Sequence, residues 1–400
     1  MVSRVPSAAE DEGPRAPVTA SGSEKLGTMV TETSGSSVSK SCEPLRVGVA
    51  GLGRMGIIHA LHIHELARET DQCRLSAVAT QDKKAGEAFL KMTGGGTPVF
   101  EDIREFAKPG LCDVTVIATN TSLHRAHATM MIEAGKRVLL EKPLTGTLEG
   151  DRAFAEVLEL EHPQALMLGF QRRFDAPTRY AKQLIDEGVI GRVYKIYSAL
   201  EDSGPAPDGF ASPGILADMG VHNVDEVVWF SGRRPERALA IGSRVFSHRL
   251  TTCDEDFDDA LMVLDFGDEL IAQIQVTRNH VSGYRGETVV YGEKGMIRVG
   301  CFRQKLLEVT VEVYGNRDAK EPIALKTFEM RSYDQPLPEF IDRYGAAYKD
   351  ELRTFLSCCR NGEPFPVNHI DGLRAQEIVA GAMSAQIPRE QMGRIDYLSV

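Results

Sequence analysis

The sequence predicts an α/β protein with two domains, an N-terminal one with a parallel sheet and a C-terminal α/β one with an open, mainly antiparallel sheet. Between residues 45 and 140, short apolar strands alternate with helical segments, which is the pattern of a doubly wound parallel sheet. From about residue 194, strand candidates follow one another through short turns with no helix between them, which favours antiparallel pairing. A chain of 400 residues is long enough for both domains.

Apolar patterns mark the elements of the N-terminal domain. A helix follows residue 56 and carries a broad apolar stripe until about Glu69. A second helix is expected around residues 125–134. The strands expected beside these helices are Leu45–Ala50, Arg74–Ala79, Val114–Thr119 and Arg137–Leu140.

The C-terminal domain is predicted from strand candidates that are followed by two helices. The helices are expected at about Tyr348–Arg360 and Gly372–Ala385. We therefore divide the chain into a tail (1–44) and two domains (45–165 and 166–395). The strands expected in the second domain are Tyr194–Glu201, Ala238–Val245, Ala260–Phe266, Leu270–Thr277, Glu287–Tyr291 and Leu306–Tyr314.

Composition narrows the classes of partner. The formal net charge is −11, whereas a general nucleic-acid binder would present a basic face. No stretch approaches the roughly 18 uninterrupted apolar residues that span a membrane. We therefore expect neither a nucleic acid nor a membrane as partner. A small neutral or anionic substrate is compatible with this charge, because the charge of a pocket is independent of the total.

The tail and the cysteines favour a cytoplasmic protein. Residues 31–41 are small and polar without apolar periodicity, so we expect residues 1–44 to be disordered. The tail has no apolar core of a secretory signal, and its acids at positions 10–12 are unlike a transit peptide. The seven cysteines are scattered and contain no C-x-x-C, which is typical of reduced thiols.

A glycine-rich turn follows the first strand directly, as Gly51-Leu-Gly53-Arg54-Met55-Gly56. In such a turn the first glycine permits the tight bend, the second lets a pyrophosphate approach the backbone, and the third allows close packing of helix on strand. The helix N-terminus offers N–H groups and partial positive charge to the phosphates. Strand, turn, helix and the next strand are all present, so the sequence predicts a dinucleotide site.

The end of the second strand bears on the choice between NAD and NADP. An NAD site usually has an acid there for the adenosine ribose, and this chain has Thr80-Gln81, with Asp82 two residues on and Lys83-Lys84 beyond. Without the carboxylate, a 2′-phosphate meets no repulsion and a lysine could attract it. We therefore keep NAD, NADP and both as hypotheses; in the alternative, Asp82 reaches back and the site is an ordinary NAD site.

Further motifs resemble one enzyme family over residues 45–385. Glu141-Lys142-Pro143-Leu144 is similar to the Glu-Lys-Pro signature of the glucose–fructose oxidoreductase/inositol dehydrogenase (Gfo/Idh/MocA) family. Within that family, the inositol 2-dehydrogenase branch is the most similar. The chain departs from the pattern at Asn120, where a proline is common, and in the loop from Asp202. The other matching segments are Gly169–Asp175, Ile190-Gly191, Asp218–Asp225, Gly283-Tyr284 and Gly292–Gly295.

The resemblance implies a Rossmann domain followed by a substrate-binding domain whose open sheet often mediates contacts in dimers or tetramers. It implies Lys142, Asp218 and His222 as the catalytic residues and a cis bond before Pro143. The predicted substrate contacts are Arg172, Asp218, His222 and Tyr284. The predicted cofactor contacts are Gly51, Gly53, Arg54, Met55, Gly56, Thr80, Thr119, Asn120, His124, Glu141 and Lys142.

The chemistry of these side chains supports the same roles. Oxidising a secondary alcohol requires a base for the hydroxyl proton while the nicotinamide takes the hydride. His222, with an ordinary pKa near 6.5, suits that task. Asp218 lies four residues earlier, so on a helix it would share a face with His222, and it could hold the imidazole or touch substrate. Lys142, at a strand's carboxyl end, could stabilise charge on the reacting oxygen.

Several plainer interpretations remain beside these roles. Arg172 is as well explained as a buried structural arginine. Asp218, His222 and Asp225 could form a metal site, but no further His or Cys cluster supports one, and Asp225 is better explained as orienting a neighbour. The group His59, His62 and His64 is interpreted as a surface cluster, because 62 and 64 point to different helix faces.

The sequence thus predicts an NAD(P)-dependent dehydrogenase for a secondary hydroxyl of a cyclic polyol or sugar, with myo-inositol 2-dehydrogenase as the leading hypothesis. A homo-oligomer, dimer or tetramer, is expected. One alternative is an NADP-linked sugar or dihydrodiol dehydrogenase of the same family. Another is a non-catalytic NAD(P)-sensing regulator, which the retained Lys142, Asp218 and His222 disfavour.

Overall fold

The structure is a computed structural model that describes residues 43–204, 213–244, 257–301, 305–315, 320–331 and 338–387. The predicted tail lies outside the described residues apart from Glu43 and Pro44, and so does most of the loop that follows Asp202. Within the part that is described, none of the helices has the length and apolar character needed to cross a membrane.

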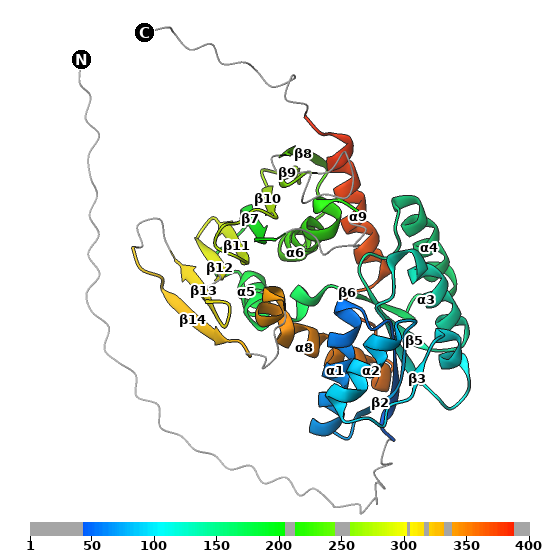
Figure 1. The fold of residues 1–400 in the computed structure, drawn as a ribbon. Coiled ribbons are helices and arrows are strands. Elements are labelled where there is room, and N and C mark those ends of the chain that lie inside the picture. Colours follow the sequence, from blue (N-terminus) through cyan, green and yellow to red (C-terminus); the bar gives the residue numbers. More distant parts are fainter. Residues whose placement is uncertain are drawn as a thin grey trace, which may run out of the picture. The chain divides into compact units, whose positions relative to one another are not determined.

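The N-terminal half is built on a six-stranded parallel sheet, sheet A, which confirms the prediction (Figure 1). Its strand order is β3-β2-β1-β4-β5-β6, so the order reverses between β1 and β4. Ligands bind at such a reversal, beyond the carboxyl ends of the strands. The strands are β1 Leu45–Ala50, β2 Cys73–Ala79, β3 Val99–Phe100, β4 Val114–Ile117, β5 Arg137–Glu141 and β6 Leu166–Gly169.

Two of the helices that connect these strands, α1 and α3, lie at the positions that the apolar pattern indicated, whereas α2 and α4 were not predicted. The buried side of α1 packs on β1 and β2, and α3 packs on β4 and β5. Strand β6 lies just beyond the predicted domain boundary after residue 165 and pairs with β5, while the boundary itself stays a prediction. The elements are α1 Arg54–Glu69, α2 Lys83–Thr93, η1 Ile103–Ala107, η2 Thr121–Leu123, α3 His124–Glu133, α4 Leu148–Glu161 and η3 Gln171–Phe174.

The second half contains an eight-stranded sheet, sheet B, with the order β14-β13-β12-β11-β7-β10-β9-β8. All its pairs are antiparallel except β7 with β10, which confirms an open, mainly antiparallel sheet. The strands are β7 Val193–Glu201, β8 Arg237–Ser243, β9 Asp259–Asp265, β10 Ile271–Thr277, β11 Arg285–Gly292, β12 Gly295–Cys301, β13 Glu308–Tyr314 and β14 Ala324–Glu329.

Two of these strands are absent from the sequence prediction. Strand β12 contains two glycines and an arginine in seven residues, which conceals its alternation of buried and partly exposed positions. Strand β14 forms the sheet edge and has no buried residue, so no apolar period marks it. Both were missed because pairing with neighbours, rather than their own pattern, defines them.

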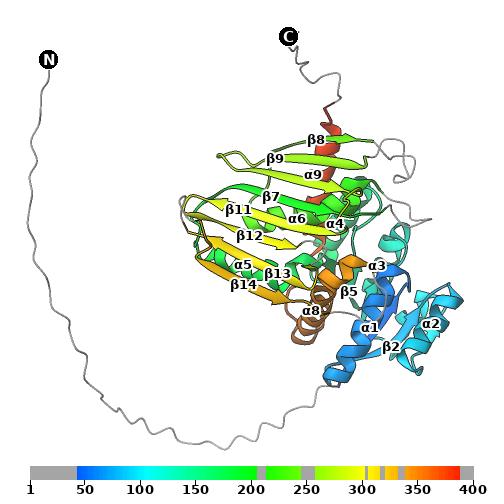
Figure 2. The ribbon, with the colours of Figure 1, turned by 60° about the vertical axis from the view of Figure 1, so that its left-hand side comes forward.

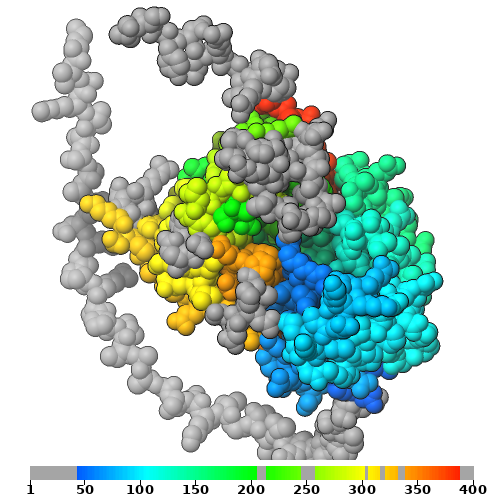
Figure 3. Space-filling model, viewed as in Figure 1, coloured from blue at the N-terminus to red at the C-terminus, as the bar shows by residue number. Residues whose placement is uncertain are grey.

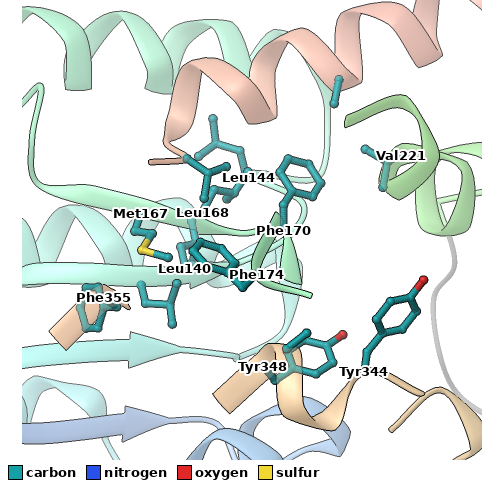
Figure 4. Close-up of a cluster of buried hydrophobic side chains, with 14 of the residues drawn as sticks. Leu140, Leu144, Met167, Leu168, Phe170, Phe174, Val221, Tyr344, Tyr348 and Phe355 are labelled. Atoms are coloured by element: carbon teal, nitrogen blue, oxygen red, sulfur yellow. The ribbon is translucent and has the colours of Figure 1, made fainter. Parts of the chain in front are cut away.

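One face of sheet B is covered by helices α5, α6 and α9 (Figure 2). Helix α8 starts at Glu339, nine residues before its predicted start at Tyr348, and packs against α1 of the first half (Figure 3). Figure 4 shows part of the core between these layers, with Leu140, Met167 and Phe355 together. The elements are α5 Ala176–Asp186, η4 Leu216–Gly220, α6 Val221–Ser231, α8 Glu339–Asn361 and α9 His369–Ser384.

Candidate active site

In the glycine turn between β1 and α1, the backbone leaves no room for a side chain at Gly51 and Gly56, whereas it leaves open space at Gly53. Gly51 has a φ of +88°, and a Cβ there would lie 2.4 Å from the Ala118 carbonyl oxygen. A Cβ on Gly56 would lie 1.9 Å from the carbonyl oxygen of Gly51. A Cβ on Gly53, by contrast, would meet nothing within 4 Å. The open side at Gly53 is therefore where a pyrophosphate can approach the backbone.

The N-terminus of α1 is suited to an anion. Gly53 is its N-cap, no side chain caps it, and its first turn contains no acidic residue. Backbone N–H groups at such an end carry partial positive charge and bind phosphate. The turn and the helix end therefore fit a dinucleotide, and Arg54 and Met55, two of the predicted cofactor contacts, lie in the first turn of α1.

The end of β2 uses its polar groups locally. The Asp82 carboxylate caps α2 by accepting the N–H groups of Lys84 at 2.9 Å and Ala85 at 3.1 Å. The Asp82 N–H donates to the Thr80 hydroxyl at 3.1 Å. The Asp82 oxygen that caps α2 is therefore engaged at the start of that helix.

Residues after β4 form a second set of predicted cofactor contacts. Asn120 caps η2 through Ser122, and the Thr119 hydroxyl lies 3.1 Å from His127. The two ring nitrogens of His124 lie 2.8 Å from the Pro143 carbonyl and 3.1 Å from the Thr119 carbonyl. His124 thus joins the loop after β4 to the loop after β5, and both ring nitrogens already face protein carbonyls.

Lys142 follows the last residue of β5 and reaches the second half of the chain. The peptide bond before Pro143 is cis, as the resemblance implied. The Lys142 ammonium donates to Asp218 twice, at 2.7 Å to the backbone carbonyl and at 2.9 Å to the carboxylate. The structure therefore brings together two of the three predicted catalytic residues.

Asp218 is held between two cations. Its second carboxylate oxygen accepts from Arg278 at 2.7 Å, and both side chains are buried. Burial alone would raise the pKa of Asp218, but Lys142 and Arg278 together hold it well below its usual range. Asp218 is therefore a carboxylate at physiological pH, available to orient cations and not to donate a proton.

Arg278 was missed by the sequence analysis. It lies one residue beyond β10, whose parallel neighbour β7 ends at the same sheet edge. The sequence placed a strand there but gave no sign that its end meets Asp218. Parallel pairing of β7 with β10 was the missing information, because the run of strand candidates favoured antiparallel pairs throughout.

His222 lies in the first turn of α6, directly after the π-helical turn η4 that carries Asp218. The Asp218 carboxylate forms ion pairs with Lys142 and Arg278, and among the described residues no hydrogen bond joins it to the His222 ring. The pKa of His222 lies well below 6.5 because of burial and the nearby charges of Lys142 and Arg172. The ring is therefore neutral at physiological pH and able to accept a proton.

Arg172 is buried beside this centre at 3% exposure. Its Nη1 donates to Glu226 at 2.5 Å and its guanidinium lies 5.6 Å from the ring centre of Tyr344. Its Nε and Nη2 have no hydrogen-bond partner among the described residues. Tyr284 is also buried and packs edge-on against Tyr344. Arg172 is thus partly structural, with donor capacity left over.

Asp225 orients a neighbour, as expected, through its ion pair with Arg173 at 2.5 and 2.9 Å. Across the described ranges, no group of three His, Cys, Asp or Glu side chains is arranged to hold a metal ion. The interpretation of Asp218, His222 and Asp225 as metal ligands therefore has no geometric support there.

The interpretation of the α1 histidines as a surface cluster was wrong. His59 and His62 are 0% and 2% exposed, and only His64 is partly exposed. Helix α8 covers this side of α1, and Tyr348 packs edge-on against His59. The sequence pattern showed the helix but not the second helix that buries it.

Comparison with known proteins agrees with this geometry. The family model for the oxidoreductase family with an NAD-binding Rossmann fold matches residues 45–170, and the model for the GFO/IDH/MocA C-terminal domain matches residues 178–298. The myo-inositol 2-dehydrogenase of Thermotoga maritima is 29% identical over 335 residues, which are 83% of this chain and 93% of that protein.

Two further relatives cover similar lengths. The scyllo-inositol 2-dehydrogenase (NAD(+)) of Bacillus subtilis is 27% identical over 85% of this chain and 94% of its own. The crystal structure of scyllo-inositol dehydrogenase from Lactobacillus casei with bound NAD(H) and scyllo-inositol has a TM-score of 0.69 at 26% identity, covering 86% and 97% of the two chains. The chain belongs to the Gfo/Idh/MocA family of oxidoreductases and carries its NAD-binding Rossmann domain.

Proposed function

We propose that this protein oxidises a secondary hydroxyl of a cyclic polyol with NAD, as a myo-inositol 2-dehydrogenase or a close relative. The observation that carries the proposal is a neutral, half-buried His222 beside the ion pair of Lys142 with Asp218. The ion pair stands at the carboxyl end of β5, in the sheet that carries the glycine turn. This arrangement supplies a base and a fixed cation to an alcohol.

His222 is the proton acceptor in this proposal. Its lowered pKa keeps the imidazole neutral in the resting enzyme, and its Nδ1 has no hydrogen-bond partner among the described residues. The bound NAD supplies the hydride acceptor. When the hydroxyl proton passes to His222, electron density remains on the substrate oxygen. That density favours departure of the hydride from the carbon that carries this oxygen.

Lys142 holds that oxygen. An ammonium group carries three N–H donors, and two of those on Lys142 are used by Asp218. The third remains for the substrate oxygen, with its direction set by the other two. Asp218, ionised between Lys142 and Arg278, positions the ammonium without competing for the proton.

Arg172 and Tyr284 are the proposed contacts to the other hydroxyls of the ring. The two partnerless guanidinium nitrogens of Arg172 are buried, and leaving buried donors unpaired is costly unless a ligand satisfies them. A polyol offers several hydroxyl oxygens at fixed spacing. The relatives named as inositol dehydrogenases make inositols the first compounds to test.

An NADP-linked sugar or dihydrodiol dehydrogenase is the second candidate. It is favoured by the engagement of Asp82 as the cap of α2, with Lys83 exposed next to it. Relative rates with NAD and NADP separate the two candidates. A regulator that senses NAD(P) without turnover is the third, and it gives no reason for Lys142 and Asp218 to form a pair beside His222.

The remaining parts of the proposal concern assembly and location. We infer a cytoplasmic homo-oligomer that associates through the face of sheet B that the helices leave uncovered. That face carries a ladder of paired charges, including Glu201 with Arg285 and Glu287 with Arg298. The first domain (45–165) would hold the cofactor and the second (166–395) the substrate. Light scattering coupled to size exclusion would give the oligomeric state.

The test is NADH formation by the purified full-length protein with a panel of inositols, sugars and a dihydrodiol. Turnover of myo- or scyllo-inositol with NAD is expected. No NAD(P) reduction with any compound, together with tight NADH binding, would instead support a dinucleotide-sensing protein.

A further inference from the structure

A buried acid–histidine pair lies directly behind Lys142. The Nε2 atom of His59, on α1, lies 2.6 Å from a carboxylate oxygen of Glu141. The His59 side chain is 0% exposed and that of Glu141 is 9% exposed. Glu141 is the last residue of β5 and precedes Lys142 in the chain. The pair therefore joins the cofactor helix to the strand end that carries Lys142.

The direction of this hydrogen bond follows from its chemistry. A carboxylate only accepts, so the Nε2–H group of His59 donates to Glu141. The Nδ1 atom of His59 has no hydrogen-bond partner among the described residues. A buried N–H without an acceptor costs more than a lone pair without a donor. The ring therefore binds in the tautomer that carries its proton on Nε2.

Neighbouring groups hold the pair in one arrangement. Tyr348 of α8 packs edge-on against the His59 ring, with 5.8 Å between ring centres, and Figure 4 shows Tyr348 on that helix. Gly169 of β6 lies opposite Glu141, and a Cβ there would be 3.4 Å from the carboxylate. The space that Glu141 occupies is thus defined by β6 on one side and by α1 on the other.

A second buried acid in this region does not compete for His59. Glu351 of α8 is 0% exposed, and neither carboxylate oxygen has a hydrogen-bond partner among the described residues. Burial, with a smaller effect from the negative charge of Glu141, raises the pKa of Glu351 well above 4.5. Because His59 lies within hydrogen-bond distance of Glu141 while Glu351 has no hydrogen-bond partner among the described residues, Glu141 is the acid that His59 binds.

We propose that His59 is a positioning residue for Lys142, acting through Glu141. Glu141 is the last residue of β5, so a bond that fixes its side chain also restrains the backbone that leads directly to Lys142. His59 lies about one helical turn after Gly56. Helix α1 therefore presents its N-terminus to the cofactor and also contacts the end of β5 through His59. This inference rests on the proposed role of Lys142 in the oxidation.

The experiment compares three single variants of the full-length protein. His59→Leu removes the donor, His59→Gln keeps an N–H donor, and His62→Gln is the matched control, because His62 is an equally buried neighbour on α1. We expect kcat with myo-inositol to fall about 10- to 100-fold in H59L, since a 1 Å misplacement of a catalytic group costs about that much. H59Q should regain most of the loss, and H62Q should stay near wild type.

Two further readouts separate positioning from a general loss of structure. NADH affinity, measured by fluorescence, should be unchanged in H59L, because the glycine turn is intact. The double variant H59L/E141Q should be no slower than its slower single variant, since the two residues act as one unit. If H59L is insoluble, His59→Asn takes its place, because its amide is too short to reach Glu141.

The outcomes are distinct. Equal losses of kcat in H59L and H62Q, or additive losses in the double variant, would overturn the positioning role. A loss of NADH affinity in H59L that matches its loss of kcat would show that His59 serves the cofactor turn instead. If the wild-type protein oxidises no polyol but binds NADH, the proposed function fails, and the positioning role fails with it.

Discussion

The glycine turn and the charged centre at Lys142 are built in opposite ways. The turn is six consecutive residues whose geometry depends on missing side chains: two glycines are required by the backbone and Gly53 leaves room. The charged centre gathers Lys142, Asp218 and Arg278 from segments far apart in the sequence, and buries their charges together. Adding atoms should disrupt the glycine turn, and removing a charge should disrupt the charged centre. We therefore expect changes in the turn to affect cofactor binding and changes in the charged centre to affect the rate.

Among the changes that compare these two regions, removing the cation is expected to have the largest effect. Lys142→Met deletes the donor to the reacting oxygen and leaves Asp218 with one cation. Loss of one such donor typically costs about 10²- to 10³-fold in kcat, which we expect for polyol oxidation. NADH affinity, measured by fluorescence titration, should change far less than the rate. A parallel loss of affinity would mean that Lys142 serves binding and would erase the contrast between the two regions.

Adding one carbon to the turn should have the opposite signature. Gly53→Ala places a methyl group in open space, so the melting temperature should stay near wild type, while NADH binding weakens by about tenfold, or roughly 1.4 kcal/mol. The matched Gly56→Ala variant forces a carbon against the Gly51 carbonyl and should lose about 1–3 kcal/mol of stability. Equal melting temperatures for the two variants would contradict the different roles given to these glycines.

The charged centre can also be tested through the effect of Arg278 on the pKa of Asp218. Arg278→Gln removes one of the two cations that lower the pKa of Asp218, so that pKa should rise. Because a lowered pKa keeps the carboxylate charged as pH falls, Asp218 of the variant should become protonated at a higher pH than in wild type. We expect a decrease of about tenfold in kcat/KM near neutral pH, from weaker placement of Lys142. An unchanged kcat/KM near neutral pH would contradict the role given to Arg278.

At the end of β2 the expected effect concerns cofactor preference and not the rate with NAD. Gln81→Asp introduces the carboxylate that an NAD site usually places there. The ratio of kcat/KM with NAD to that with NADP should rise by about 10-fold, close to 1.4 kcal/mol, mostly through a higher KM for NADP. An unchanged ratio would mean that the adenosine ribose lies elsewhere, and the glycine turn alone would then not place the cofactor.

The parts predicted from sequence share one property, which is that their evidence is local. The turn at Gly51 and the strand before Lys142 each depend on a few neighbouring residues. The helix α6, which contains His222, lies between β7 and β8, where the sequence pattern wrongly predicted no helix. The burial of His59 depends on α8, and the position of Arg278 on the pairing of β7 with β10. Neither the burial of His59 nor the position of Arg278 can be inferred from the neighbouring residues in the sequence. The ion pair between Asp218 and Lys142 depends on how the two halves of the chain pack together, which no local pattern reports.

His222 provides the most direct test of the central claim, that a neutral, half-buried imidazole takes the hydroxyl proton. The measurement is the pH dependence of kcat/KM for inositol oxidation by wild type and His222→Ala, with added imidazole as a rescue. Because the pKa is lowered, the wild-type acid limb should lie below pH of about 6.5, where an ordinary histidine titrates. H222A should lose about 10²- to 10⁴-fold and regain activity with imidazole. Wild-type rates in H222A without imidazole would contradict the account.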